Sequence, residues 1–274
     1  MVRRDRAERR YLVSQPVRSP GAVTYSVWKA LFLREAVNRV SGRRAAWLWL
    51  LLEPVAHIVF LMFVMTVIRL RVVGGIDTPL WIMVGLLAFF VFRRTATQGM
   101  NAIGANQALF AYRQVKPVDT VLVRAGLEGF AMVLIATILF VGAGLFGLQI
   151  IPADPLAVLE ATFGLWLVGL GFGLITSVAT ELVPEIGKLI GLVLTPLYLF
   201  SGVIFPIAKV PPPYRDWLLL NPLVHGLEAT RLGFAPHYEA VSELSIGYLF
   251  GFALVTIFLG LVLHVRFALR LVTK

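Results

Sequence analysis

Long apolar stretches recur along the chain, and they constrain its fold more than any other feature of the sequence. A helix needs about 20 apolar residues to cross the ~30 Å hydrocarbon core of a bilayer. Only 15% of the residues are charged, and the mean hydropathy is +0.83. The sequence therefore predicts an all-α integral membrane protein with six transmembrane helices. These spans are expected at about 47–68, 79–100, 121–147, 156–182, 187–205 and 245–270.

Positive charge is distributed unevenly among the segments that join these stretches. If the six helices alternate in direction, 20 of the 25 Lys and Arg residues fall on the side of the N-terminus. Cytoplasmic segments carry such an excess, so both termini are predicted to be cytoplasmic. The net charge of +10 has the same explanation, and a nucleic acid partner is not expected.

The first 46 residues contain no apolar core, so a cleaved signal peptide is not expected. We therefore divide the chain into a basic N-terminal extension over 1–24 and a single transmembrane domain over 25–274.

Two polar segments carry helical patterns without being apolar enough to cross the membrane. Residues 25–40 alternate apolar side chains with Lys and Arg, which is typical of an amphipathic helix in the inner interface, with Trp28 at headgroup depth. A gating role and a simple positive anchor both fit this helix. Residues 206–234 are amphipathic and interrupted by prolines. We expect them to form two short re-entrant helices that dip into the outer leaflet between spans five and six.

The second predicted span contains an anomaly. Only the 14 residues from 79 to 92 are free of charge before Arg93 and Arg94. The two side chains therefore either snorkel to the inner headgroups or line a wet cavity.

Two pairs of ionisable residues show the spacing of neighbours on one helix face. Glu53 and His57 lie in the first span, where a packed pair of Glu53 with His57 or with an arginine is the favoured interpretation. A proton relay and a contact with substrate or with a partner protein remain open. Arg124 and Glu128, at the start of the third span, are predicted to pair within their own helix.

A compact polar stretch, residues 104–120, separates the second and third spans. The orientation places it in the cytoplasm, with Phe110 and Tyr112 expected to be exposed beside Arg113 and Lys116. Exposed aromatic and basic side chains are typical of a protein-docking surface. Anchoring of the aromatic rings at the membrane interface is the alternative.

The sequence lacks the motifs of an enzyme or of a cofactor site. It has no cysteine, its four histidines show no metal-ligand spacing, and it contains no Walker A motif, so ATP has to be bound by another chain. A formal GxGxxG at 142–147 lies inside an apolar stretch, where close helix packing explains it better. The same explanation applies to the glycine pairs 169/173, 187/191 and 247/251. The turn that holds Glu181 and Glu185 suits a docking or gating contact.

Three stretches of the sequence resemble a known family: "ALFLREAVNRVSGRRAAWLWLLLEPVAH", "GANQALFAYRQVKPVDTVLVRAGLE" and "PLYLFSGVIFPIAKVPPPYRDWLLLNPLVHGLEATRLGF". They look like the permeases of the capsule polysaccharide exporters, the KpsM type within the ABC-2 transporter superfamily. The resemblance covers about residues 25–270, and the middle stretch is its most specific part.

The resemblance implies a permease of the bacterial inner membrane that moves lipid-anchored capsular polysaccharide. It implies a homodimer with two copies of a separate ABC ATPase, which holds the ATP and Mg. The permease itself then has no catalytic residue. A periplasmic polysaccharide co-polymerase and an outer-membrane channel are expected to continue the path of the glycolipid polysaccharide.

The resemblance also implies roles for individual residues. The ATPase-coupling region would comprise Asn106, Gln107, Phe110, Tyr112, Arg113, Lys116, Pro117 and Asp119, together with Glu181 and Glu185. The gate helix would contain Tyr25, Trp28, Arg34 and Glu35, and the re-entrant exit region Asn221, His225, Glu228 and Arg231. The family pattern does not include Arg93 and Arg94. As a separate hypothesis, these two arginines would attract an acidic glycan along the substrate path, and Trp81, Phe89 and Tyr198 would stack on its sugars.

Three other interpretations remain open. An ABC-2 permease for O-antigen or a teichoic-acid-like glycan would share the fold but not the substrate. An ATP-independent secondary transporter would require inverted repeats and buried ionisable groups near the midplane, of which only Glu53 and His57 are candidates. A membrane-embedded glycan transferase would require an acid pair or a metal motif, which the sequence does not contain.

Overall fold

The computed structural model describes residues 19–41, 46–68 and 72–273, so the predicted extension over 1–24 lies largely outside the described residues. The chain forms long helices joined by short elements. The elements in chain order are α2 (Pro20–Ser41), α3 (Ala46–Ile68), β1 (Val72–Val73), β2 (Ile76–Asp77), α4 (Thr78–Met100), η1 (Gly104–Ala111), α5 (Pro117–Leu145), α6 (Pro155–Leu182), α7 (Glu185–Phe200), η2 (Ile207–Lys209), α8 (Tyr214–Leu218), α9 (Pro222–Phe234), α10 (Ile246–Arg266) and α11 (Ala268–Val272).

Five of the described helices are long and apolar enough to cross a membrane: α3 from Leu51, α4, α5, α6 and α10. They confirm the prediction of an all-α integral membrane protein. The fifth predicted span, 187–205, corresponds to α7, which has only 16 residues. At 1.5 Å per residue this helix is about 24 Å long, shorter than the bilayer core. It ends early because Gly202 takes a positive φ of 75° just after its last residue.

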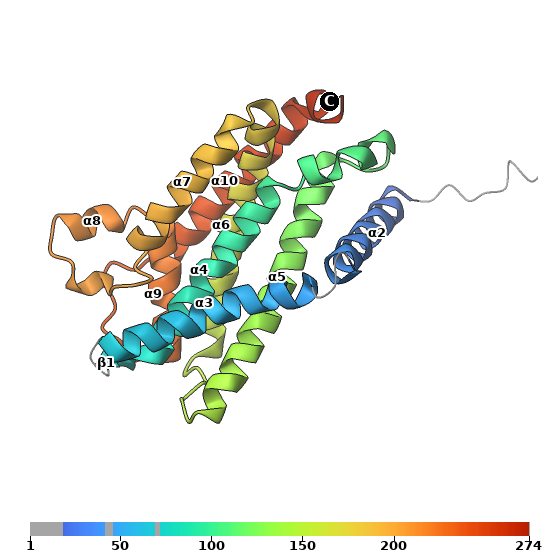
Figure 1. Ribbon diagram of the computed structural model, residues 1–274. Helices are drawn as coiled ribbons and strands as arrows, with labels where there is room; N and C mark the ends of the chain where they lie inside the picture. The colour runs from blue at the N-terminus through green and yellow to red at the C-terminus, as the bar shows by residue number, and fades with distance from the viewer. Residues whose placement is uncertain (1–18, 42–45, 69–71, 274) are drawn as a thin grey trace, which may run out of the picture.

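Helix α4 is the centre of the bundle. In its 18-residue apolar window 78% of the residues are buried within the chain, against 11% in the window of α3 and 17% in that of α10. Helices α4, α6, α7 and α10 run side by side, whereas α2 lies at the edge of the molecule against α5 (Figure 1). Most of the hydrophobic core therefore forms around α4, between α6, α5, α3 and α9.

Close helix packing accounts for some of the predicted glycine pairs. A Cβ added at Gly169 would lie 2.8 Å from the Phe92 carbonyl oxygen, and one at Gly173 would lie 3.1 Å from the Gly99 Cα. This pair therefore lets α6 approach α4 closely, as predicted. Gly142, Gly191 and Gly251 have no such neighbour within 4 Å in the described chain.

A small β-hairpin before α4 is an element that the all-α prediction missed. Strands β1 and β2 pair antiparallel, with Val72 opposite Asp77 and Val73 opposite Ile76. The turn consists of Gly74 and Gly75, whose φ angles are 59° and 91°. Two residues with positive φ form the tight turn that a two-residue hairpin requires, and glycine adopts it without steric cost.

The segment between α7 and α10 forms two short helices, as the sequence predicts. Helix α8 has five residues, none of them buried. Helix α9 has 13 residues, of which 11 are buried against α6, α4 and α10. It begins at Pro222, a position where the missing N–H carries no penalty. Helix α9 is thus part of the core, although it is far too short to cross a membrane.

Candidate functional site: the polar interface of helix α2

Helix α2 is attached to the bundle through polar side chains. The Trp28 indole N–H donates a hydrogen bond to Asp119 Oδ1 at 2.8 Å, and the Arg34 guanidinium donates to the Asn106 side-chain oxygen. Two ion pairs extend the contact, joining Glu35 to Arg124 at 2.7 Å and Arg39 to Glu128 at 2.5 Å. We call these eight residues the α2 interface. Its members are Trp28, Arg34, Glu35 and Arg39 on α2, with Asn106 on η1 and Asp119, Arg124 and Glu128 on α5.

The two ion pairs of the α2 interface are complementary in spacing. Glu35 and Arg39 are four residues apart on α2, and Arg124 and Glu128 are four residues apart on α5 with the opposite order of charge. Both pairs form at once because the two helices meet in matching register. The predicted pairing of Arg124 with Glu128 inside one helix is wrong, since each is paired with α2 instead. Sequence reasoning does not single out Arg39, and the complementary spacing is the signal that could have found it.

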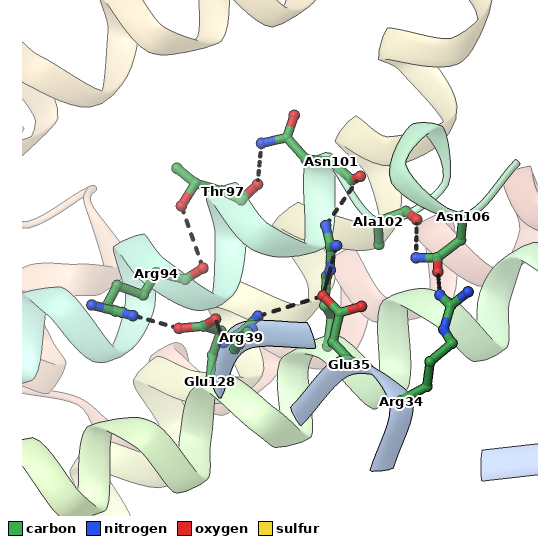
Figure 2. Close-up of polar contacts among 10 residues, drawn as sticks. Arg34, Glu35, Arg39, Arg94, Thr97, Asn101, Ala102, Asn106 and Glu128 are labelled. Atoms are coloured by element: carbon green, nitrogen blue, oxygen red, sulfur yellow. Dashed lines mark hydrogen bonds and ion pairs between the residues drawn. The ribbon is translucent and has the colours of Figure 1, made fainter. Parts of the chain in front are cut away.

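Glu128 connects three helices. Its side chain has no exposed surface, and its carboxylate pairs with Arg39 of α2 and, at 2.9 Å, with Arg94 of α4 (Figure 2). A buried carboxylate requires such compensation, because desolvating an unpaired charge is costly. Arg94 is therefore held in an ion pair where α4 meets α5, and its place on the substrate path stays a prediction.

Arg93, the neighbour of Arg94, differs from it. Its side chain is exposed, and within the described part of the chain it has no hydrogen bond or ion pair. The two adjacent arginines thus have different environments, and only Arg93 remains available to a ligand.

The segment 104–120 divides into a buried part and an exposed part. Phe110 is 5% exposed and packs in a hydrophobic cluster with Ile103 and Val121, so the prediction that its ring is presented outward is wrong. The 3₁₀ helix η1 turns this side chain toward the bundle. In contrast, Tyr112 is 67% exposed. Arg113 and Lys116 are also exposed, so the basic and aromatic surface has shifted toward the end of the segment.

The remaining coupling residues of this segment are in structural positions. Asp119 accepts a hydrogen bond from the Lys116 backbone N–H at 3.0 Å, and Pro117 occupies the first turn of α5. The Gln107 amide donates to Glu181 at 3.0 Å, which ties η1 to the end of α6. Glu185 is exposed in the first turn of α7. Asn106 and Asp119, predicted for coupling, thus contact Arg34 and Trp28, predicted for the gate helix.

A second buried ion pair lies at the other end of the bundle. Arg231 has no exposed surface, pairs with Glu228 at 2.9 Å, and donates to the carbonyl oxygens of Gly202 at 2.8 Å and Val203 at 3.1 Å. Its guanidinium lies 3.8 Å from the centre of the Trp81 ring, within cation–π distance. The Tyr238 hydroxyl donates to Glu228 at 2.9 Å.

Protonation in this second cluster follows from burial. Burial raises the pKa of Tyr238 to about 12, so its hydroxyl remains a hydrogen-bond donor at neutral pH. Burial also raises the pKa of Glu228, against the opposing effects of Arg231 and Tyr238. The group fixes the end of α7 to α9 and α4, and we call Trp81, Glu228, Arg231 and Tyr238 the Arg231 cluster.

Two further exit residues stabilise local structure. The Asn221 side chain accepts from the Leu223 N–H at 3.1 Å and so caps α9. His225 is 4% exposed; its Nε2 lies 2.8 Å from the Leu219 carbonyl oxygen, and its Nδ1 accepts from the Ser245 N–H at 3.1 Å. These contacts fix the neutral tautomer with the proton on Nε2.

The predicted aromatic substrate path and the predicted intramembrane pair are not formed. Trp81 and Phe89 have no exposed surface, so neither ring is free to stack on a sugar. Tyr198 is half-buried, with its ring edge against Phe89 at 5.1 Å. Glu53 and His57 are exposed on α3 and make no hydrogen bond or ion pair with any described residue, although the His57 ring meets Phe90 of α4 with ring centroids 5.4 Å apart.

Metal chemistry finds no support in the described ranges, where no group of three His, Asp or Glu side chains could hold an ion. The α2 interface is a set of contacts between helices, through which movement of one helix can reach another.

The arrangement of apolar spanning helices around a buried α4 is that of a polytopic membrane protein. Residues 26–235 match the profile of the ABC-2 type transporter family, and the chain belongs to this family.

Within the family, the chain is similar to the KpsM type of capsule polysaccharide export permease. It is 38% identical over 237 residues to the polysialic acid transport protein KpsM of Escherichia coli, covering 86% of this chain and 91% of that protein. It is 28% identical over 248 residues to the capsule polysaccharide export inner-membrane protein BexB of Haemophilus influenzae, covering 90% and 93%. The similar protein CtrC of Neisseria meningitidis is 27% identical over 242 residues, covering 87% and 90%.

Proposed function

We propose that this protein is the permease subunit of an ATP-driven ABC exporter that moves lipid-anchored capsular polysaccharide across the bacterial inner membrane. The membership of the family and the names of the similar proteins support this function. The observation that carries the mechanism is the α2 interface, which connects the segment 104–120 to α2. A force applied to that segment would be passed directly to the gate helix.

The topology that we propose has six spans, with α7 as the fifth and both termini in the cytoplasm. The distribution of Lys and Arg supports this orientation. It places the α2 interface at the cytoplasmic end and the Arg231 cluster at the outer end. Helices α8 and α9 are then the re-entrant pair at the outer leaflet, and the backbone of α9 is satisfied within the core.

The partners follow from the missing ATP-binding motif. We propose a homodimer that binds two copies of an ABC ATPase subunit, which hold ATP and Mg, and that delivers polymer to a periplasmic co-polymerase and an outer-membrane channel. The proposed contacts with the ATPase are the exposed residues Tyr112, Arg113 and Lys116. Exposed Glu185, at the next cytoplasmic turn of the chain, is a fourth proposed contact. Buried Phe110 supports this surface from below.

The mechanism that we propose passes movement through pairs of charges. When the ATPase closes on ATP, it displaces the end of segment 104–120, and α5 moves with it because Asp119 lies in its first turn. The ion pairs of Arg124 and Glu128 then carry α2 along. Arg94 of α4 pairs with the same Glu128 and so connects α4 to this contact. Arg93 remains free at this depth, and we assign to it the attraction of an acidic polymer.

A pulldown tests this function most directly. The tagged full chain is purified in mild detergent from its native membrane, beside Tyr112→Asp and the control Trp217→Asp, which alters an equally exposed aromatic residue on α8. We expect the ATPase to co-purify with the native chain and with the control but not with Tyr112→Asp. If the ATPase binds all three chains equally, the docking surface does not include Tyr112. If no ATPase accompanies the native chain, the secondary transporter becomes the better interpretation.

A further inference from the structure

A deep groove runs between α5 and α6, with α4 and α9 as its floor. Its volume is about 800 Å³, within the range of sites that hold small molecules. The floor on α4 is formed by Val84, Leu87, Ala88 and Val91, which share one helix face. The groove is separate from the α2 interface and from the Arg231 cluster.

The chemistry of the groove excludes a sugar. Its wall is almost entirely carbon, and the side-chain hydroxyls in it belong to Thr137, Thr162 and Thr230. Each of these hydroxyls already donates to a carbonyl of its own helix, at 2.8, 2.7 and 2.7 Å. A glycan would lose hydrogen bonds to water and gain none here. A hydrocarbon chain meets no such penalty.

The groove occupies one half of the membrane thickness. On α6 its lining extends from Pro155, the first residue of the helix, to Trp166. The eleven steps from Pro155 to Trp166 correspond to a rise of about 16 Å, close to one leaflet of a ~30 Å core. The Trp166 indole closes the deep end, because it donates to the Ala125 carbonyl oxygen of α5 at 2.9 Å. The shallow end lies at the loop that holds Ile150 and Pro152.

The mouth of the groove faces the surroundings of the bundle. Phe130 and Val133 on α5 and Leu159 and Phe163 on α6 are between 53% and 64% exposed along its rim. Larger uncovered faces are found on α3 and α10, whose spans are only 11% and 17% buried, and these suit a second copy of the chain better. The groove therefore opens to lipid.

We propose that the groove binds one acyl chain of a phospholipid from the outer leaflet, with the methyl end of the chain at Trp166. The assignment to the outer leaflet rests on the orientation given under the proposed function, whereas the binding itself does not. The bound chain fills the space between α5 and α6, so it supports α5, the helix that begins at the ATPase-coupling segment.

Lipid retention tests the proposal. The full chain is purified in mild detergent and its bound phospholipid is measured by native mass spectrometry, beside Ala136→Phe and Ile138→Phe. Ala136 lines the groove, whereas Ile138 is 47% exposed on another face of the same helix. We expect about one retained phospholipid for each native or Ile138→Phe chain, and about a tenfold loss in Ala136→Phe. Equal retention in all three, or none in the native chain, would overturn the proposal.

Fluorescence gives a second measurement on the native groove, independent of the filled variant. Phospholipids brominated near the methyl end should quench Trp166 more strongly than those brominated near the carbonyl, with Trp166→Phe identifying the signal. The opposite order would overturn the proposed depth. A dimer that dissociates in Ala136→Phe without loss of lipid would show a second copy as the occupant. Because neither measurement uses the ATPase, their failure leaves the result of the pulldown unaffected, and a pulldown without ATPase leaves lipid retention unaffected.

Discussion

The two ion-paired clusters of this molecule differ in how they are built. In the Arg231 cluster both charges have no exposed surface, and the pair forms within one helix, at positions three residues apart. In the α2 interface the pairs join different helices, and the paired arginines Arg39 and Arg124 are 14% and 11% exposed. Removing one charge from the first cluster leaves its partner with no access to water. In the α2 interface, Glu128 that loses Arg39 still has Arg94 as a partner.

The difference indicates two mechanical roles for the same chemistry. A fully buried pair fixes the backbone around it, here the carbonyls of Gly202 and Val203 at the end of α7. The pairs of the α2 interface join separate helices at the edge of the bundle and keep some contact with solvent at their arginines, so they hold α2 without fixing the backbone around them. The Arg231 cluster is suited to rigidity, and the α2 interface to movement.

The largest effect is expected from Arg231→Ala. This change leaves Glu228 buried without its charge partner and removes the donors to two carbonyls, so we expect a loss of about 3–5 kcal/mol in the free energy of unfolding. Arg215→Ala is the matched control, because Arg215 pairs with half-exposed Glu243 at 3.7 Å and should matter by less than about 1 kcal/mol. Thermal unfolding in detergent compares them, and similar losses would contradict the distinction.

Gly85→Ala should cause the next largest loss in the free energy of unfolding. A Cβ at this position would collide with the Arg231 guanidinium, which lies against the Trp81 ring and cannot retreat without losing its hydrogen bonds. We expect a cost of about 1–3 kcal/mol. Gly251→Ala on α10, where no atom lies within 4 Å, should be neutral or slightly stabilising. Thermal unfolding of both variants measures the contrast, which equal stabilities would disprove.

Charge reversal should break and then restore the α2 interface. Glu35→Arg places two cations together, so α2 should detach from α5, export should fall, and the free energy of unfolding should drop by about 1–3 kcal/mol. Adding Arg124→Glu should restore the pair and most of the export. Because the natural sequence has no cysteine, spin labels at cysteines introduced on α2 and α5 can report the separation. If the double variant exports no better than the single one, the pair does not carry the coupling.

The smallest effect on stability is expected from Tyr112→Ala. The side chain is 67% exposed, so unfolding should change by less than about 0.5 kcal/mol, while ATPase binding weakens by about 1–2 kcal/mol. Phe110→Ala should show the reverse order, with a stability loss of about 3 kcal/mol or more from the emptied core site. Binding assays beside thermal unfolding separate the two, and a stability loss in Tyr112→Ala would contradict the exposed placement.

The spanning helices were predictable because each apolar stretch is continuous and long, and only α7 is shortened by a glycine turn at Gly202. The partners of individual side chains could not be predicted, because the spacing of residues within a helix does not say which helix lies opposite. Arg124 and Glu128 fit a pair within α5 as well as they fit α2, and only the register of the two helices decides. Phe110 was misplaced for a similar reason, since a 3₁₀ turn rotates it inward.

The contact between Trp166 and Ala125 has a geometric consequence for α5. This helix has 29 residues, so it is about 43 Å long, and Trp166 touches it about a third of the way from Pro117. If α5 tilts about this contact, its outer end sweeps a larger arc than its inner end, in the ratio of the two arms. The helix is then a lever with a fulcrum at Trp166, and a small displacement beside the ATPase becomes a displacement roughly twice as large at the outer surface.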